Sequence, residues 1–383
     1  MVRKTTALTV LVMTLFTFSG CWDYREIDKL PVVVGMAIDI NDEGKHVVTA
    51  ELVDIAESGH ESAMVKPRII RTEGDTLFDA LRNAIAFEKG RIYTGHLELV
   101  ILGRSALESR LVEVLDFLIR DVEARMSIWL LASQEDTAAE LLETNTITGK
   151  VRTFEISQMI EAQKDLAKSF EMNINEFMNQ MQCRGCSSVI PSMKLHNTAG
   201  TETQALSGTA ILKNNRLSGF IDGEETKYFC LITDRVKGGI LVIDSEPGKQ
   251  RKDTALEILE NKTKIKPKLS DGKISIEVEI KTKVALGEHG STKHKYSEGI
   301  EVHKKQAEDL IRDNASALVK KMQTEFDADI FGFGHSIHMD YPELWRKIED
   351  NWDEYFKTLE VVIKPAVEIT ESGLLQESIT KGD

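Results

Sequence analysis

The chain has 383 residues, of which 42% are hydrophobic, and a formal net charge of −14 at pH 7. The acidic balance opposes nucleic acid binding, which needs a basic footprint, and it opposes adhesion of the protein surface to anionic headgroups. The hydrophobic fraction is ample for real cores, and the length is typical of two or three domains. Four cysteines indicate that the fold does not depend on a disulfide framework.

The first segment reads as an export signal. Arg3 and Lys4 precede an uncharged apolar run at 7–18. That run is too short to cross a hydrocarbon core of roughly 30 Å as a helix, which takes about 20 residues, but it suits a signal peptide. It ends in Phe18-Ser19-Gly20-Cys21, which looks like a lipobox. We therefore expect a signal peptide at 1–20 and a lipidated tether at 21–30.

The Cys21 thiol is the predicted lipidation site, because it is the only side chain there that can take a diacylglyceryl group. A lipidated N-terminal cysteine carries at least two acyl chains, which anchor stably where one chain does not. The alternatives are an ordinary signal peptide with an incidental cysteine and an uncleaved anchor. Residues 21–383 carry a net charge of −16, because Arg3 and Lys4 leave with the signal peptide.

The region 31–198 is predicted to be an N-terminal α/β region of one or two subdomains. It opens with a hairpin of strands 32–40 and 47–53 around a turn at 41–44. Further strands are expected at 68–72, 97–102, 127–132 and 188–195, and helices at 75–88, 111–119, 136–143 and most of 152–182. Strands that alternate with helices indicate sheets covered by helices.

Within helix 75–88, helical spacing places four apolar residues on one face, which we expect to be buried: Leu77, Phe78, Leu81 and Ile85. A polar stretch at 196–204 predicts a domain boundary. A C-terminal α+β domain at 205–371 and a polar tail at 372–383 are expected beyond it.

The C-terminal domain begins with a hairpin that turns at Asn214-Asn215. A helix at 224–231 and strands at 240–244, 274–284 and 360–369 are expected to follow. Strand 274–284 alternates cleanly, so it should be half-buried and antiparallel. The longest helix, 303–326, carries an apolar stripe predicted to pack on the sheet rather than on a membrane or partner: Ala307, Leu310, Ile311, Ala315, Leu318, Val319 and Met322. Pro342 opens a final helix.

The predicted fold class is α+β: mixed and multi-domain, with sheets covered by helices and a long helix packed on a mostly antiparallel sheet in the C-terminal part.

Cys183-Arg184-Gly185-Cys186 forms a CxxC motif with three interpretations. A redox dithiol would open a helix after a strand, but this motif follows a helical stretch. As half a zinc site it lacks a second pair, although His196 could be a third ligand. A local disulfide, or two inert thiols in a loop, is favoured.

Few residues suggest chemistry. His335 and His338 form an HxxH near Asp340, which could bind a metal, but the region reads as a connector. Nucleophile-elbow, zinc-protease, Walker and dinucleotide motifs are missing from the sequence. We therefore predict no catalytic residue, no metal site and no cofactor, although catalytic groups can be assembled from distant segments.

Several motifs together resemble the C subunit of spore nutrient-germinant receptors, the GerAC or Ger(x)C family. Cys21-Trp22-Asp23-Tyr24-Arg25-Glu26-Ile27 resembles its start, and Val34-Gly35-Met36-Ala37-Ile38-Asp39 its first strand. Gly95-His96-Leu97 and the stretch 120–125 are similar to its middle. Asp329-Ile330-Phe331-Gly332-Phe333-Gly334, with Pro342, Trp345 and Trp352, resembles its C-terminal signature. The CxxC is outside this pattern.

The resemblance implies a non-enzymatic lipoprotein on the outer face of the spore inner membrane, required for the germination response. It also implies two partners, a membrane-embedded A subunit and a transporter-like B subunit, and leaves direct nutrient binding open. The alternatives are a membrane-tethered solute-binding lipoprotein of a transporter and an exported hydrolase. A solute binder usually has two similar α/β lobes, and a hydrolase needs a nucleophile or metal motif.

Overall fold

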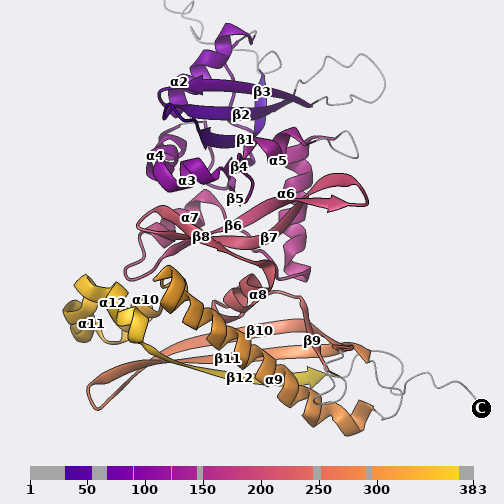
Figure 1. Ribbon diagram of the computed structural model, residues 1–383, viewed down its shortest axis with the longest axis vertical. Coiled ribbons are helices and arrows are strands. Elements are labelled where there is room, and N and C mark those ends of the chain that lie inside the picture. The colour runs from indigo at the N-terminus through magenta and orange to yellow at the C-terminus, as the bar shows by residue number, and fades with distance from the viewer. Residues whose placement is uncertain are drawn as a thin grey trace, which may run out of the picture.

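The computed structural model describes the greater part of the chain between Pro31 and Thr370. The described residues are 31–53, 67–88, 90–121, 123–144, 150–244, 252–289 and 296–370. Their strands form an eight-stranded sheet and a four-stranded sheet, which follow one another along the longest axis of the molecule (Figure 1). Within these ranges, the helices are too short or too polar to cross a membrane.

The eight-stranded sheet has the order β3-β2-β1-β4-β5-β6-β7-β8. Its strands are β1 Val32–Ile40, β2 His46–Val53, β3 Pro67–Gly74, β4 Leu99–Leu102, β5 Trp129–Ser133, β6 Ser188–Thr198, β7 Thr201–Lys213 and β8 Arg216–Ile221. The four central strands, β1, β4, β5 and β6, are parallel. Antiparallel strands flank them on both sides, and the predicted first hairpin is β1 and β2.

Helices cover both faces of the parallel centre. They are α2 Leu77–Asn83, α3 Arg104–Ser109, α4 Leu111–Arg120, α5 Ala139–Glu143, α6 Arg152–Ala162 and α7 Ile174–Met181, with 3-10 turns η2 Ala84–Ala86 and η3 Gln163–Asp165. Met36 and Ile38 of β1 belong to the core that α2, α3 and α4 share. Ala37, between them, belongs to a second core with α5 and α6. Successive strand residues point to opposite faces, so both faces are apolar.

The helix predicted at 75–88 is shorter than expected, and only two of the four residues predicted to be buried are buried. Leu77 and Leu81 are buried, but Phe78 is 51% exposed and Ile85 is 42% exposed. The α-helix ends at Asn83, and Ile85 lies in η2. A 3-10 turn advances about 120° per residue where an α-helix advances about 100°, so the helical spacing no longer holds there.

The polar stretch at 196–204, where a domain boundary is predicted, comprises the end of β6, the hairpin turn and the start of β7. β6 and β7 are hydrogen-bonded neighbours in one sheet. The boundary in the sequence therefore does not coincide with the division between the sheets. That division comes after β8, where α8, Gly223–Ile232, leads to β9. The hairpin at Asn214-Asn215 is as predicted, and both asparagines have positive φ.

The four-stranded sheet has the order β12-β11-β10-β9. Its strands are β9 Ile240–Ile243, β10 Thr254–Ser270, β11 Lys273–His289 and β12 Glu360–Thr370. β11 pairs antiparallel with β10 and parallel with β12. β10 is missing from the sequence prediction, because charged residues fill every second position from Glu260 to Lys268 and hide its strand pattern.

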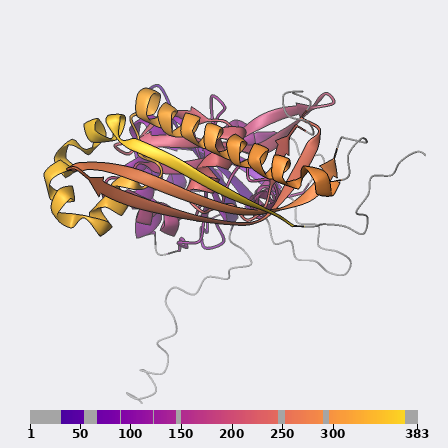
Figure 2. The ribbon, with the colours of Figure 1, turned by 90° about the horizontal axis from the view of Figure 1, so that it is seen from below.

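The long helix α9, Tyr296–Lys321, crosses this sheet diagonally, as Figures 1 and 2 show. Its predicted stripe is confirmed, because Ala307, Ile311, Ala315 and Met322 are fully buried. One π-helical turn, η4 Met322–Phe326, follows. There Gln323 donates to the carbonyls of Phe356 and Leu359, at 2.9 and 2.8 Å, which fixes the start of β12.

The helix expected from Pro342 is divided, and another helix precedes it where the sequence suggested a connector. It comprises α10 Phe333–Asp340, α11 Pro342–Ile348, the 3-10 turn η5 Glu349–Asn351 and α12 Trp352–Thr358. Trp345, Ile348, Trp352 and Phe356 are buried, so the segment packs an apolar side against the core despite the breaks.

Candidate functional site

The C-terminal signature forms a tight turn around Asp329. Its carboxylate accepts from four backbone N–H groups that open α10. Phe331, Gly332 and Phe333 donate to Oδ1 at 3.0–3.2 Å, and Gly334 donates to Oδ2 at 2.8 Å. Burial raises the pKa of Asp329 to about 6, although the four N–H donors act in the opposite direction. The acidic residue and the glycines of the signature are thus explained by a helix start with unpaired donors.

The CxxC motif lies directly against this turn. Cys183 and Cys186 are joined in a disulfide. The backbone N–H of Ser187 donates to the Asp329 carbonyl at 2.7 Å. Gly185 has φ of +69°, and a Cβ there would lie 2.3 Å from Trp345 and 3.1 Å from the Gly334 Cα. The loop between α7 and β6 is therefore fitted to the signature, a role that the spacing of the cysteines alone could not reveal.

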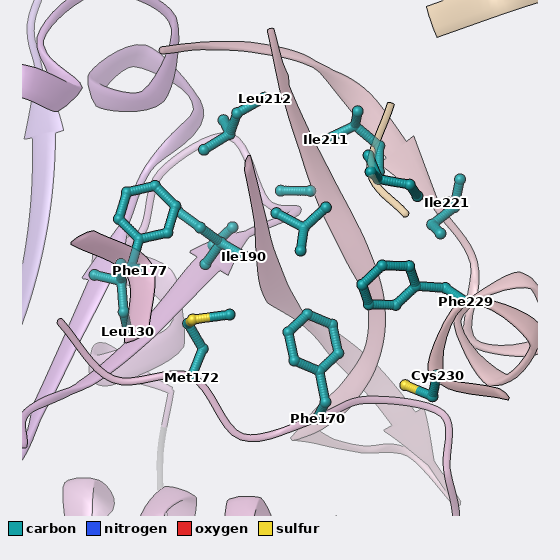
Figure 3. Packing of buried hydrophobic residues seen from close by; sticks show 14 of the residues in the cluster. Leu130, Phe170, Met172, Phe177, Ile190, Ile211, Leu212, Ile221, Phe229 and Cys230 are labelled. Atoms are coloured by element: carbon teal, nitrogen blue, oxygen red, sulfur yellow. The ribbon is translucent and has the colours of Figure 1, made fainter. Parts of the chain in front are cut away.

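A path of aromatic rings leads from the signature into the region of the eight-stranded sheet. Neighbouring ring centroids are 5.1–6.4 Å apart along Trp345, Trp352, Phe356, Phe333, Phe331, Phe229 and Phe170. Figure 3 shows Phe170 and Phe229 facing each other beside Cys230 of α8. Such contacts favour one rigid arrangement of the two sheets.

Ion pairs line the rim of the same junction. Lys213 of β7 contacts Asp327 and, at 3.1 Å, Asp353. Burial lowers the pKa of Lys213, but the two carboxylates outweigh it, so the pKa is raised above its usual value. Lys357 also contacts Asp327, at 3.3 Å. These pairs connect the eight-stranded sheet to both ends of the C-terminal helical segment.

A cavity of about 260 Å³ opens beside Phe170, the last ring of the aromatic path, between η3 and the segment after α8. Arg235 lies over the Phe170 ring at 5.2 Å, and the hydroxyl of Ser169 is buried without a hydrogen-bond partner. Burial raises the pKa of the Cys230 thiol to about 12, so it is no nucleophile at neutral pH.

The motif of the first strand has a structural explanation. A Cβ at Gly35 would lie 2.0 Å from the Thr153 hydroxyl, so only glycine lets α6 approach β1. Asp39 accepts from the backbone of Ala138 and Ala139 at the start of α5, at 2.8 and 3.2 Å. Burial raises the pKa of Asp39. Glu51 of β2, which is in register with Gly35, is also buried and caps α6.

The middle motifs meet around Thr94, which precedes Gly95-His96-Leu97. Its hydroxyl donates to Asp121 at 2.9 Å and to Glu123 at 3.1 Å. Glu123 also pairs with Arg91 at 3.1 Å. The charged residues of the 120–125 motif thus hold the turn that leads into β4.

The other residues singled out in the sequence are not assembled into a site. Cys21, the predicted lipidation site, lies outside the described residues. His335 is exposed on α10, and His338 packs edge-on against Trp345 at 5.9 Å. His196 is exposed near the end of β6. In the described ranges there is no cluster of three or more potential metal ligands.

Comparison with known proteins identifies the family. Residues 23–195 match the family "Spore germination protein N-terminal domain", and residues 207–373 match "Spore germination B3/GerAC like, C-terminal". Spore germination protein KC of Bacillus subtilis is 24% identical over 99% of this chain and 98% of its own length. Spore germination protein YndF of the same organism is 24% identical over 98% of both chains.

A solved structure has the same fold. The crystal structure of the GerBC protein matches with a TM-score of 0.54 and 22% identity, over 90% of this chain and 99% of that one. The two family matches leave a gap at 196–206, close to the boundary that the polar stretch predicted. These relatives are named for germination and not for a catalysed reaction. The chain belongs to the GerAC family of spore germination proteins.

Proposed function

We propose that the protein is the lipoprotein C subunit of a spore nutrient-germinant receptor, a non-enzymatic accessory subunit required for the germination response. The observation that carries this proposal is the likeness to named germination proteins over almost the whole chain. The signature turn, the disulfide loop and the aromatic path support it as well, because they build a rigid junction rather than an open catalytic cleft.

The anchor of this subunit is Cys21, on the outer face of the spore inner membrane. Its partners are the membrane-embedded A subunit and the transporter-like B subunit. A tether in the same membrane makes the second contact effectively intramolecular, so that a modest affinity for the partners suffices. The protein then acts by docking and not by turnover of a substrate.

One structural observation separates this proposal from a solute-binding lipoprotein. A solute binder usually has two similar lobes, whereas the two sheets here differ in strand number and direction. Calorimetry of residues 22–383 against single nutrients tests the difference. We expect no saturable heat, and a micromolar site would favour the solute-binding alternative.

The genetic test is deletion of the gene in a spore-former without a redundant receptor. We expect the response to at least one single nutrient to be lost and then restored by the wild-type gene. A normal germination response to every nutrient would contradict the proposal.

The anchor is tested separately with Cys21→Ala. Mass spectrometry should find a lipid adduct on the wild type, and the variant should leave the membrane fraction and co-purify less of the A and B subunits. A matched control is the double variant Cys183→Ser/Cys186→Ser, which changes two cysteines far from the lipobox and should stay anchored. Unchanged fractionation of Cys21→Ala, with no adduct on the wild type, would show that the anchor is elsewhere.

A further inference from the structure

An exposed apolar surface lies on the helical segment that follows β3. Phe78 is 51% exposed, Ile85 is 42% exposed and Phe87 is 57% exposed. The Phe78 ring is 6.1 Å from that of Phe117 on α4, so the surface continues across two helices. We call Phe78, Ile85, Phe87 and Phe117 the apolar end. Three large exposed apolar side chains within ten residues are the kind of surface that marks a contact with a partner or a membrane.

The apolar end is held in place and is not a frayed terminus. Glu88, next to Phe87, forms a two-pronged ion pair with Arg68 of β3, one contact of which is 3.0 Å. Thr76 caps α2 by accepting from the Asp79 backbone at 3.1 Å. The backbone that carries these side chains is therefore held at both ends.

The apolar end lies close to the point where the chain enters the fold. The backbone N–H of Tyr93 donates to the Pro31 carbonyl at 2.9 Å, and Val33 donates back to Tyr93 at 3.0 Å. Phe87 precedes Tyr93 by only six residues in the sequence. Pro31 follows Cys21 by ten, which reaches at most about 35 Å when fully extended. A lipid on Cys21 would thus keep the apolar end near the bilayer.

Figure 1 places α2 and β3 at one end of the long axis and the four-stranded sheet at the other. Contact through the apolar end would stand the molecule upright on the membrane. The C-terminal sheet and the signature turn would then lie away from the lipid.

The charges nearby suit a lipid interface. Residues 77–93 hold three basic and two acidic side chains in a chain whose net charge is −14. Arg82 lies over the Phe78 ring at 4.8 Å, which combines a cation with an aromatic ring. Both acidic residues of α4 are paired, Glu113 with Arg110 at 2.7 Å and Asp116 with Arg120 at 2.8 Å. Aromatic rings beside arginine are favoured at headgroup depth.

We propose that the apolar end inserts into the headgroup region of the bilayer that carries the Cys21 anchor. This inference rests on the proposed lipid anchor and adds the orientation of the fold. The contact comes from the aromatic and apolar side chains, because the acidic surface as a whole would be repelled by anionic lipid.

The test uses the lipidated full-length mature protein in vesicles of phosphatidylethanolamine and phosphatidylglycerol. Phe87→Cys is labelled with an environment-sensitive NBD dye. Labelling is selective, because Cys183 and Cys186 form a disulfide and Cys230 is buried. The matched control is Met339→Cys on α10, a position that is 65% exposed in the C-terminal part.

We expect the dye at position 87 to shift to the blue and to be quenched severalfold more by spin-labelled lipid than the dye at position 339. Equal, water-like spectra at both positions, in protein that floats with the vesicles, would overturn the inference and leave the anchor intact. Protein that fails to float would instead contradict the anchor and the inference together. Shielding of position 87 only after co-reconstitution with the A and B subunits would assign the surface to a protein partner.

Discussion

The two sheets bury their faces differently, and the difference decides which substitutions each sheet can tolerate. Eight of the nine residues of β1 are buried, because helices cover both faces of the parallel centre. On β11, buried Ile274, Ile276, Val278 and Ile280 alternate with charged or polar residues on the open face. A substitution in the parallel centre of the first sheet therefore disturbs a core on either face. In the second sheet the loss of stability depends on whether the residue points to the buried face or to the open face.

In both regions, nevertheless, buried carboxylates cap the first turn of helices by accepting hydrogen bonds from backbone N–H groups. In the eight-stranded region Glu51 accepts from the backbone of Arg152 and Thr153 at 2.7 Å, and Asp39 accepts at α5. In the C-terminal region Asp329 accepts from four backbone donors. The number of donors left without a partner should set the cost of removing each carboxylate.

A large loss of stability is expected for Asp329→Ala. It leaves several buried N–H groups unsatisfied, at about 1–3 kcal/mol each before relaxation, so we expect a loss on the order of 4 kcal/mol. Urea denaturation followed by the fluorescence of Trp345 and Trp352, which lie beside the turn, measures it. The control is Asp340→Ala on exposed Asp340, which should change stability by less than about 0.5 kcal/mol. Similar losses for both variants would contradict the capping role.

The next effect is a pH dependence. Burial raises the pKa of Asp329 from 3.8 to about 6 in the folded state. Between about pH 6 and pH 4 the folded state therefore holds a proton that the unfolded chain releases. The free energy of unfolding should then rise as the pH falls through this window, by about 3 kcal/mol in all.

Subtracting the pH profile of Asp329→Asn, which does not titrate there, isolates this contribution. Urea denaturation at steps from about pH 7 to pH 4 gives both profiles. A difference that is flat, or that falls with falling pH, would show that the four backbone donors keep the carboxylate ionised despite its burial.

A smaller effect is expected for the disulfide loop. The double variant Cys183→Ser/Cys186→Ser opens a short loop, for which chain entropy predicts a loss of about 2 kcal/mol. Since Gly185 lies against Trp345, the tryptophan emission of the folded protein should also shift to the red. A reducing agent should weaken the wild type to the same level and leave the serine variant unchanged. If the reducing agent left the free energy of unfolding of the wild type unchanged, the bond would have no stabilising role.

Much of the fold could be predicted from the sequence, because hydrophobic period is a local signal. The first hairpin, the stripe of α9 and the alternation of β11 all follow it. Ile85 was misplaced because helical period does not reveal where a helix ends, and Phe78 because it lies about 100° round α2 from Leu77, at the edge of the buried face. β10 was missed because its lysines obscure the pattern that its pairing with β11 imposes.

The junction was harder to predict than the elements. The CxxC and the Asp329 signature are more than 140 residues apart in the sequence, and their contact depends on how the two sheets meet. The signature could be identified only by family resemblance, and the cysteines by no resemblance at all. Local patterns contain no information on which distant loop fits which turn, so only the structure brings Gly185 against Trp345 and Gly334.

The smallest effect is expected on the open face of the four-stranded sheet. Glu279 of β11 pairs with Lys266 of β10 at 2.5 Å, but both side chains are partly in water, so Glu279→Ala should leave the free energy of unfolding almost unchanged. Its neighbour Ile280 is fully buried, and Ile280→Ala should cost about 2–5 kcal/mol. On β4, where both faces are covered, Ile101→Ala and Leu102→Ala should both cost about 2–5 kcal/mol. Urea denaturation of the four variants compares the sheets directly. A costly Glu279→Ala would mean that this face is covered in the assembled protein, and a mild change on β4 would mean that one of its helical layers packs loosely.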